Sequence, residues 1–197
     1  MPPVDPNAVL MTGENSFIRL SSDGGTTLTD RASHWRVLWC PAGGGHALFL
    51  QSTLTGGQVK IYSDNIAVAR WLQTSIEKLL FPAFADTSVP VIAARFDRHG
   101  GPWSTATETV TATDARVTMS WYDCIEPFVL HAPPGFNDRP IGVFSTFFPA
   151  RAAQLEVNGK VAPGQVWPEM RGDRQGSSAT LAWSETWVKP RGPGRRC

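Results

Sequence analysis

One stretch of the chain has the hydrophobic spacing of a helix. Between Asp64 and Phe81, apolar residues recur at steps of three and four and define one helical face. This face contains Val68, Leu72, Ile76 and Leu79, with Trp71 and Leu80 beside them. The opposite side contains mainly polar residues, namely Arg70, Gln73, Thr74, Glu77 and Lys78. Ser63 or Asp64 can cap the first turn, and Pro82 prevents continuation beyond Phe81. The sequence predicts a helix over 64–81 that covers one open end or one face of a β structure.

Most other segments have the two-residue period or the composition of β-strands. The strongest candidates are 16–21, 34–40, 46–54, 91–97, 116–123, 141–148 and 178–188. Asn158 and Gly159, between two further short strands, suit a type I′ hairpin turn. With the weaker segments the count reaches about 8–10 strands. We therefore expect a mainly β, antiparallel barrel or sandwich with the prominent helix 64–81 at its centre.

The whole chain, 1–197, is expected to form a single domain. Its length allows a substantial core, and no shift in composition divides it. Residues 1–15 are rich in proline and polar groups, which predicts an N-terminal arm without a core of its own. Residues 189–197 predict a flexible basic tail, and 164–176 predicts a polar loop.

Charge and cysteine content narrow the classes of partner. A net charge of +1 gives no electrostatic reason to expect nucleic acid or an acidic membrane surface. The chain has neither a signal-peptide pattern nor an apolar run near the roughly 20 residues that span a bilayer. Its three cysteines form no CxxC motif, and Cys40 and Cys124 are expected to be buried and inert. We expect a cytoplasmic protein with reduced thiols, and association into a homo-oligomer stays open.

Glu185 is the most suggestive single residue. By the two-residue period it shares one strand face with Ala179, Leu181, Trp183 and Trp187. If that face is buried, burial without a partner raises the pKa of the carboxyl and makes it an acid or base near neutral pH. The alternative is a face that points outward, or a carboxylate that pairs with an arginine in a structural network.

A second polar group follows the strand that contains Trp121. Asp123 ends this strand, and Glu126 and His131 come soon after it. Two carboxylates and an imidazole at a barrel mouth can divide acid and base roles in a proton-transfer reaction. The alternative is that strand ends are polar without any chemical role.

No motif predicts a metal or a cofactor. The four histidines form neither HxH nor HExxH, although His34 and His46 flank one hairpin and could face each other, which keeps a metal as an alternative. The glycines at 43–45 lack the ending of a phosphate-binding loop. The charges of 171–174 are interpreted as solvated, with the binding of an acidic ligand as the alternative.

Two functional hypotheses follow. In the first, a small apolar or aromatic molecule binds within the β structure, and its binding residues are Trp183, Trp187, Trp121 and Glu126. This hypothesis extends to a cofactor-independent lyase, hydratase or isomerase with the catalytic residues Glu185, Asp123 and His131. In the second, the chain is a non-catalytic binding or assembly protein whose eight tryptophans form core and subunit contacts. A cavity-facing Glu185 favours the first hypothesis, and an arginine-paired or exposed one favours the second.

Overall fold

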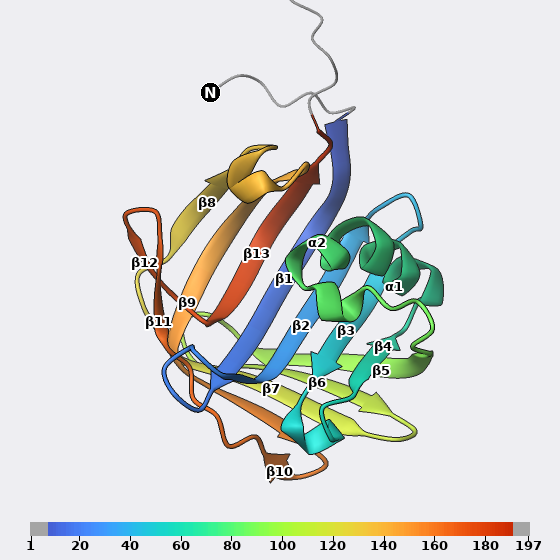
Figure 1. Cartoon of the computed structure of the whole chain (residues 1–197), viewed down its shortest axis with the longest axis vertical. Helices are drawn as coiled ribbons and strands as arrows, with labels where there is room; N and C mark the ends of the chain where they lie inside the picture. Colours follow the sequence, from blue (N-terminus) through green and yellow to red (C-terminus); the bar gives the residue numbers. More distant parts are fainter. Residues whose placement is uncertain (1–7, 191–197) are drawn as a thin grey trace, which may run out of the picture.

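The chain folds into a closed nine-stranded β-barrel with one 15-residue helix (Figure 1). The computed structural model describes residues 8–190. Strands account for 57% of the residues and helices for 14%. The sequence prediction of a mainly β fold with one prominent helix is therefore confirmed, and of the two architectures it allowed, the structure is the barrel.

The strand order around the barrel is β9-β13-β1-β2-β3-β4-β5-β6-β7, and β7 closes the ring by pairing with β9. The bounds of these strands are β1 (Val9–Ser21), β2 (Leu28–Trp39), β3 (Gly45–Gln51), β4 (Val59–Ser63), β5 (Val91–Gly100), β6 (Ala106–Ala112), β7 (Arg116–Cys124), β9 (Gly142–Val157) and β13 (Ala179–Val188). Three further pieces flank the ring. These are β8 (Phe128–Ala132) and β10 (Lys160–Val161), which pair with β9, and the hairpin of β11 (Pro168–Arg171) and β12 (Arg174–Ser177).

The helix connects the one parallel pair of neighbouring strands in the described barrel. Because β4 and β5 run in the same direction, their connection has to cross from one end of the sheet to the other. This crossover consists of α1 (Ile66–Leu72), a π-helical turn (Gln73–Glu77) and α2 (Lys78–Leu80). The cap is Asn65, whose side chain accepts from the amides of Ala67 and Val68, and not Ser63 or Asp64 as predicted. A short 3₁₀ turn, η4 (Pro82–Phe84), follows the helix.

The helix packs on the outer surface of the barrel, in front of β2, β3 and β4 (Figure 1). Val68, Leu72 and Ile76 are fully buried there, as their spacing predicts, whereas Leu79 is only partly buried. The prediction that Glu77 faces away from the sheet is wrong, because it is fully buried and accepts hydrogen bonds from Ser33 and Trp35 of β2. Gln73 is also fully buried, but under the segment after the helix, where it donates to the carbonyl oxygens of Phe84 and Asp86. In a π turn each residue advances less around the helix axis than in an α-helix. The turn thereby brings Glu77 round to the barrel side.

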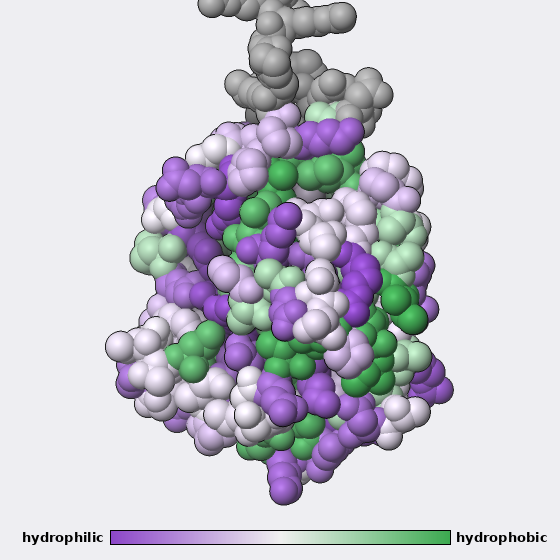
Figure 2. All heavy atoms as spheres, turned by 45° about the vertical axis from the view of Figure 1, so that its right-hand side comes forward, coloured by the Kyte–Doolittle hydropathy of each residue, from purple (hydrophilic) through white to green (hydrophobic). Residues whose placement is uncertain are grey.

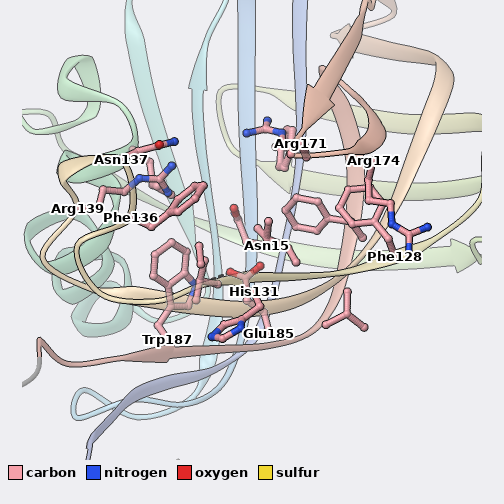
Figure 3. Close-up of a pocket in the computed structure, with 18 of the residues that line it drawn as sticks. Asn15, Phe128, His131, Phe136, Asn137, Arg139, Arg171, Arg174, Glu185 and Trp187 are labelled. Atoms are coloured by element: carbon pink, nitrogen blue, oxygen red, sulfur yellow. Dashed lines mark hydrogen bonds between the residues drawn. The ribbon is translucent and has the colours of Figure 1, made fainter. Parts of the chain in front are cut away.

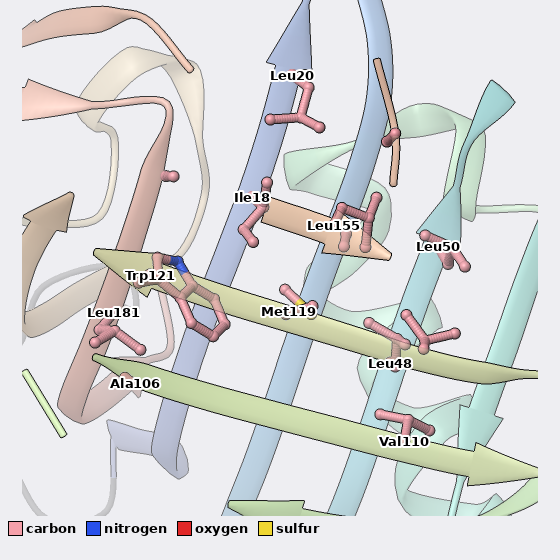
Figure 4. Close-up of a cluster of buried hydrophobic side chains, with 14 of the residues drawn as sticks. Ile18, Leu20, Leu48, Leu50, Ala106, Val110, Met119, Trp121, Leu155 and Leu181 are labelled. Atoms are coloured by element: carbon pink, nitrogen blue, oxygen red, sulfur yellow. The ribbon is translucent and has the colours of Figure 1, made fainter. Parts of the chain in front are cut away.

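Apolar side chains fill the inside of the barrel. Figure 4 shows them between β1, β2 and β3 on one side and the crossing strands β6 and β7 on the other. They include Ile18, Leu20, Leu48, Leu50, Val110, Met119, Trp121, Leu155 and Leu181. Trp121 is fully buried and donates its indole N–H to the carbonyl oxygen of Phe17 at 3.1 Å. The middle of the barrel is therefore a packed core.

A second core lies between the helix and the outer face of the sheet. It contains Met11, Trp35, Phe49, Leu72 and Trp187. Figure 2 views the helix side of the molecule, where green apolar side chains reach the surface between purple polar ones. Met11 is buried within β1, which begins at Val9, so residues 9–15 belong to the barrel and not to the predicted arm. Residues 1–7 of that arm, and 191–197 of the predicted tail, lie outside the described residues.

Two turn predictions have different outcomes. Asn158 and Gly159 both have positive φ, 53° and 78°, and connect β9 to β10 as the Asn-Gly signal predicts. The stretch 164–176, predicted as a loop, instead contains β11 and most of the hairpin that it forms with β12. These strands have four residues each and are largely exposed, so no hydrophobic alternation marks them in the sequence.

Candidate ligand-binding site

A β-bulge in β13 decides where Glu185 points. The pairing of β13 with β9 slips between Trp183 and Thr186, and Ser184 has a left-handed φ of 55°. Before the bulge, Leu181 and Trp183 face the barrel interior. After it, Trp187 belongs to the outer core. The predicted shared face of residues 179–187 is therefore wrong, because the bulge separates Trp183 from Glu185 and Trp187.

Glu185 and Trp187 line a cavity of about 620 Å³ on the outer surface of the barrel. Its floor is formed by β1, β13 and β9. Three walls rise from this floor: β8 with the turn η5 (Phe136–Asp138), the β11–β12 hairpin, and the end of the helix (Figure 3). The apolar lining residues include Phe17, Leu79, Phe81, Leu130, Val143 and Phe147. A cavity of this size and character fits a small organic molecule.

Glu185 is a buried carboxyl group at the floor of this cavity. It is 3% exposed, and its Oε1 accepts a hydrogen bond from the indole N–H of Trp187 (Figure 3). Burial raises its pKa to about 8, with smaller upward contributions from Glu77 and Glu14, while Trp187 and the nearby Ser145 act in the opposite direction. Glu185 has no arginine partner among the described residues. The group is thus mainly protonated at neutral pH, and it can donate a proton to a ligand.

A second buried carboxyl, Glu77, lies beside the cavity, between the helix and the outer face of β2. It accepts hydrogen bonds from the hydroxyl of Ser33 and the indole N–H of Trp35. Asn15, which lines the cavity, donates to the Ser33 oxygen at 2.9 Å and so connects this network to the site. Burial raises the pKa of Glu77 to about 7. Glu77 and Glu185 each have an indole donor, and those rings, of Trp35 and Trp187, lie 6.0 Å apart.

His131 borders the same cavity, but its ring does not meet Glu185. The imidazole stacks on Phe144 with 4.2 Å between ring centroids. Successive side chains of a strand point to opposite faces, and Leu130 packs toward Phe17 and Phe147 on the cavity side. The His131 ring is therefore on the other face of β8.

The other residues predicted for the site lie elsewhere. Asp123 is exposed and contacts Arg151 at 3.3 Å, and it does not line the cavity. Glu126 lines a separate hollow of about 80 Å³, which also contacts Phe128 and Arg174. Trp121 is in the barrel core. The structure thus brings together Glu185 and Trp187, places His131 at the edge, and does not bring in Asp123, Glu126, Trp121 or Trp183.

Trp183 instead belongs to a polar cluster inside one end of the barrel. The Arg98 guanidinium lies over its ring at 5.5 Å, forms an ion pair with Glu14 at 2.6 Å, and also pairs with Glu108. His34 is buried beside them and stacks on His46 at 6.1 Å between centroids, so these histidines do face each other. Burial, with repulsion from His46 and Arg98, lowers the pKa of His34 to about 3. The buried His34 ring and the paired charges of Arg98, Glu14 and Glu108 fill this end of the barrel.

The described residues offer no metal centre and no membrane-spanning helix. Within 8–190, no group of three or more His, Cys, Asp or Glu side chains is placed to hold a metal ion. None of the helices in the same range has the length and apolar character needed to cross a bilayer. Cys40 and Cys124 are unpaired, and burial raises the pKa of both thiols, which makes them poor nucleophiles.

Several residues of the cavity, and Glu77 beside it, are missed by the sequence analysis. Glu77 is assigned to the polar helix face because a period of 3.6 does not anticipate the π turn. Arg19 and Arg139 have no sequence signal, because they come to line one cavity only when β1 forms its floor and the segment after η5 forms part of a wall. Arg171 and Arg174 do stand out in the sequence, as a charged stretch for which an acidic ligand is the alternative interpretation.

Comparisons of this chain with protein-family models, with curated proteins and with solved structures find no match.

Proposed function

We propose that this protein binds a small apolar or aromatic molecule in the outer cavity. The observation that carries the proposal is the buried Glu185 carboxyl, without a charged partner among the described residues, at the floor of a cavity of about 620 Å³ that is lined by both apolar and polar side chains. Leaving such a group without a charged partner costs stability, and a cavity lined by Trp187, Phe147 and Phe17 loses packing contacts. A ligand that fills the space and keeps water away from the protonated Glu185 restores the packing contacts, and it leaves the carboxyl in its neutral form, which burial favours.

Acid–base catalysis on the bound molecule is the second candidate function. It is favoured by the pKa of Glu185 near 8, since a group that titrates close to the working pH is an effective proton donor or acceptor. With Asp123 outside the cavity, Glu185 is the group that would exchange a proton with the ligand. The reactions within reach of one such group are cofactor-independent isomerisations and eliminations. The proposal places the protein in the cytoplasm, where its free thiols stay reduced.

A variant in which a larger side chain fills the cavity tests the proposal. Leu130 points into the cavity from β8 and is only partly buried, so Leu130→Trp introduces an indole where the ligand would lie. The probe is 2-naphthamide, a neutral aromatic molecule, and the measurement is its affinity by isothermal titration. We expect the wild type to bind the probe and Leu130→Trp to bind it at least about tenfold more weakly, because the site is filled.

The matched control is Val161→Trp, a similar enlargement at an exposed position on β10. It should retain the affinity of the wild type. Equal binding by Leu130→Trp and the wild type would place the probe somewhere else and remove the support for this cavity.

A further inference from the structure

Several arginines lie along one side of the cavity, and two of them are placed where their repulsion destabilises the sheet. Arg19 on β1 and Arg31 on β2 are direct cross-strand partners. Like charges in this arrangement destabilise a sheet. The Arg31 guanidinium lies over the Phe81 ring at 3.4 Å, and burial together with Arg19 lowers its pKa to about 10. The Nε atoms of Arg19 and Arg31 are both buried without a hydrogen-bond partner among the described residues.

Two more arginines, Arg171 and Arg139, line the cavity from its walls. Arg171 contacts Glu169 Oε2 at 2.8 Å, and Arg19 contacts the same oxygen at 2.6 Å, so two guanidiniums share one carboxylate. Arg139, after η5, is half-buried, and its side chain has no hydrogen-bond or ion-pair partner within the described part of the chain. Burial lowers the pKa of Arg171, Glu169 acts in the opposite direction, and repulsion from Arg19 and Arg139 adds a smaller lowering.

The carboxyl at the cavity floor does not balance this charge. Glu185 is mainly protonated at neutral pH, as described above, so it contributes little negative charge. Glu169 is already shared between two arginines, and the cavity lining sets the single further carboxylate of Asp173 against Arg19, Arg139, Arg171 and Arg174. The site therefore has an excess of guanidinium groups next to an apolar floor. Guanidinium forks match the geometry of a carboxylate.

We infer that the ligand is an amphipathic organic acid, whose carboxylate lies between Arg139, Arg171 and Arg19 and whose apolar body packs against Trp187 and Phe147. This inference rests on the proposed function, because it names the chemical class of molecule for the same cavity. The carboxylate supplies the partner that Arg139 lacks and relieves the repulsion among the three arginines. The protonated Glu185 then lies in the apolar part of the site.

Two probes that differ only in charge test the inference. They are 2-naphthoate and 2-naphthamide, which have the same ring system and nearly the same shape. Their affinities are measured by isothermal titration for the wild type, Arg139→Gln and Arg171→Gln. We expect the wild type to bind the carboxylate about tenfold to a hundredfold more tightly than the amide, since hydrogen bonds between charged groups are the strong ones. Arg139→Gln should remove most of this preference, because it weakens binding of the carboxylate much more than binding of the neutral amide.

The control is Arg95→Gln, at an exposed arginine of β5 that pairs with Asp97 at 3.0 Å and does not line the cavity. It should change neither affinity, and in the wild type only the carboxylate should bind more weakly as salt is added. Equal affinity of the wild type for both probes, unchanged in Arg139→Gln, would overturn the inference and leave the cavity as a neutral binding site. If neither probe binds, the proposed function fails as well.

Discussion

Ser184 has a larger effect on the site than its exposed side chain suggests. Its left-handed φ of 55° is costly for a residue other than glycine, of order 1–3 kcal/mol, and it allows the bulge in β13. Without the bulge, strict alternation would point Glu185 into the barrel together with Trp183. The bulge instead aims the carboxyl at the outer cavity, beside Trp187.

The Glu185 carboxyl makes stability depend on pH in a defined direction. Its pKa is about 8 in the folded protein and near 4.5 when unfolded, so between these values the folded state holds a proton that the unfolded state releases. This stabilisation is complete below about pH 4.5 and is lost as the pH rises toward 8. Glu185→Gln keeps the shape of the side chain but does not titrate. We therefore expect the melting temperature of Glu185→Gln, relative to the wild type, to be higher at pH 8 than at pH 5.

The exposed Glu126→Gln serves as the matched control and should give the same difference from the wild type at both pH values. Glu77 titrates in all three proteins, and its interaction with Glu185 is small beside the effect of burial. A Glu185→Gln melting temperature that follows the wild type in parallel from pH 5 to pH 8 would show that Glu185 is already ionised in the folded state.

At the scale of elements, the crossover between β4 and β5 is the most informative feature. The hydrophobic spacing is sufficient to predict its helix, because Val68, Leu72 and Ile76 pack on the sheet at the expected intervals. Its polar face is not predictable in the same way. The π turn at 73–77 rotates Glu77 toward the outer face of the sheet. There Ser33 and Trp35, from a strand far away in sequence, donate hydrogen bonds to it.

The helix face can be tested through Leu72. It is fully buried against the barrel, so Leu72→Ala removes buried contacts and leaves a cavity. We expect a loss of about 2–5 kcal/mol in the free energy of unfolding, measured by urea denaturation. Lys78→Ala, on the exposed side of the same helix, should change it by less than about 0.5 kcal/mol. Similar small losses for both variants would mean that the helix is not packed on the sheet as described.

At the scale of the whole molecule, the cavity lies outside a barrel whose interior is already filled. Apolar side chains occupy the middle, and the cluster of Arg98, Glu14, Glu108 and His34 occupies one end. The fold class follows from the sequence because many short two-period segments accompany a single helical one. The site is less predictable, since Glu185 reaches it through a bulge and the arginines come from β1, the segment after η5 and the β11–β12 hairpin. Local patterns do not record which distant segments form opposite walls of a cavity.

The most direct test of the central claim is to observe which tryptophan indole N–H signal shifts when the ligand binds. In an ¹⁵N-correlated NMR spectrum each indole N–H gives one signal. The signals of Trp187 and Trp121 are assigned by their loss in Trp187→Phe and Trp121→Phe. Trp187 lines the outer cavity, whereas Trp121 is in the barrel core. With 2-naphthoate as the probe, we predict a saturable shift of the Trp187 signal while the Trp121 signal stays in place. A shift of Trp121 with Trp187 unmoved would mean that the ligand enters the barrel and would contradict an outer binding site.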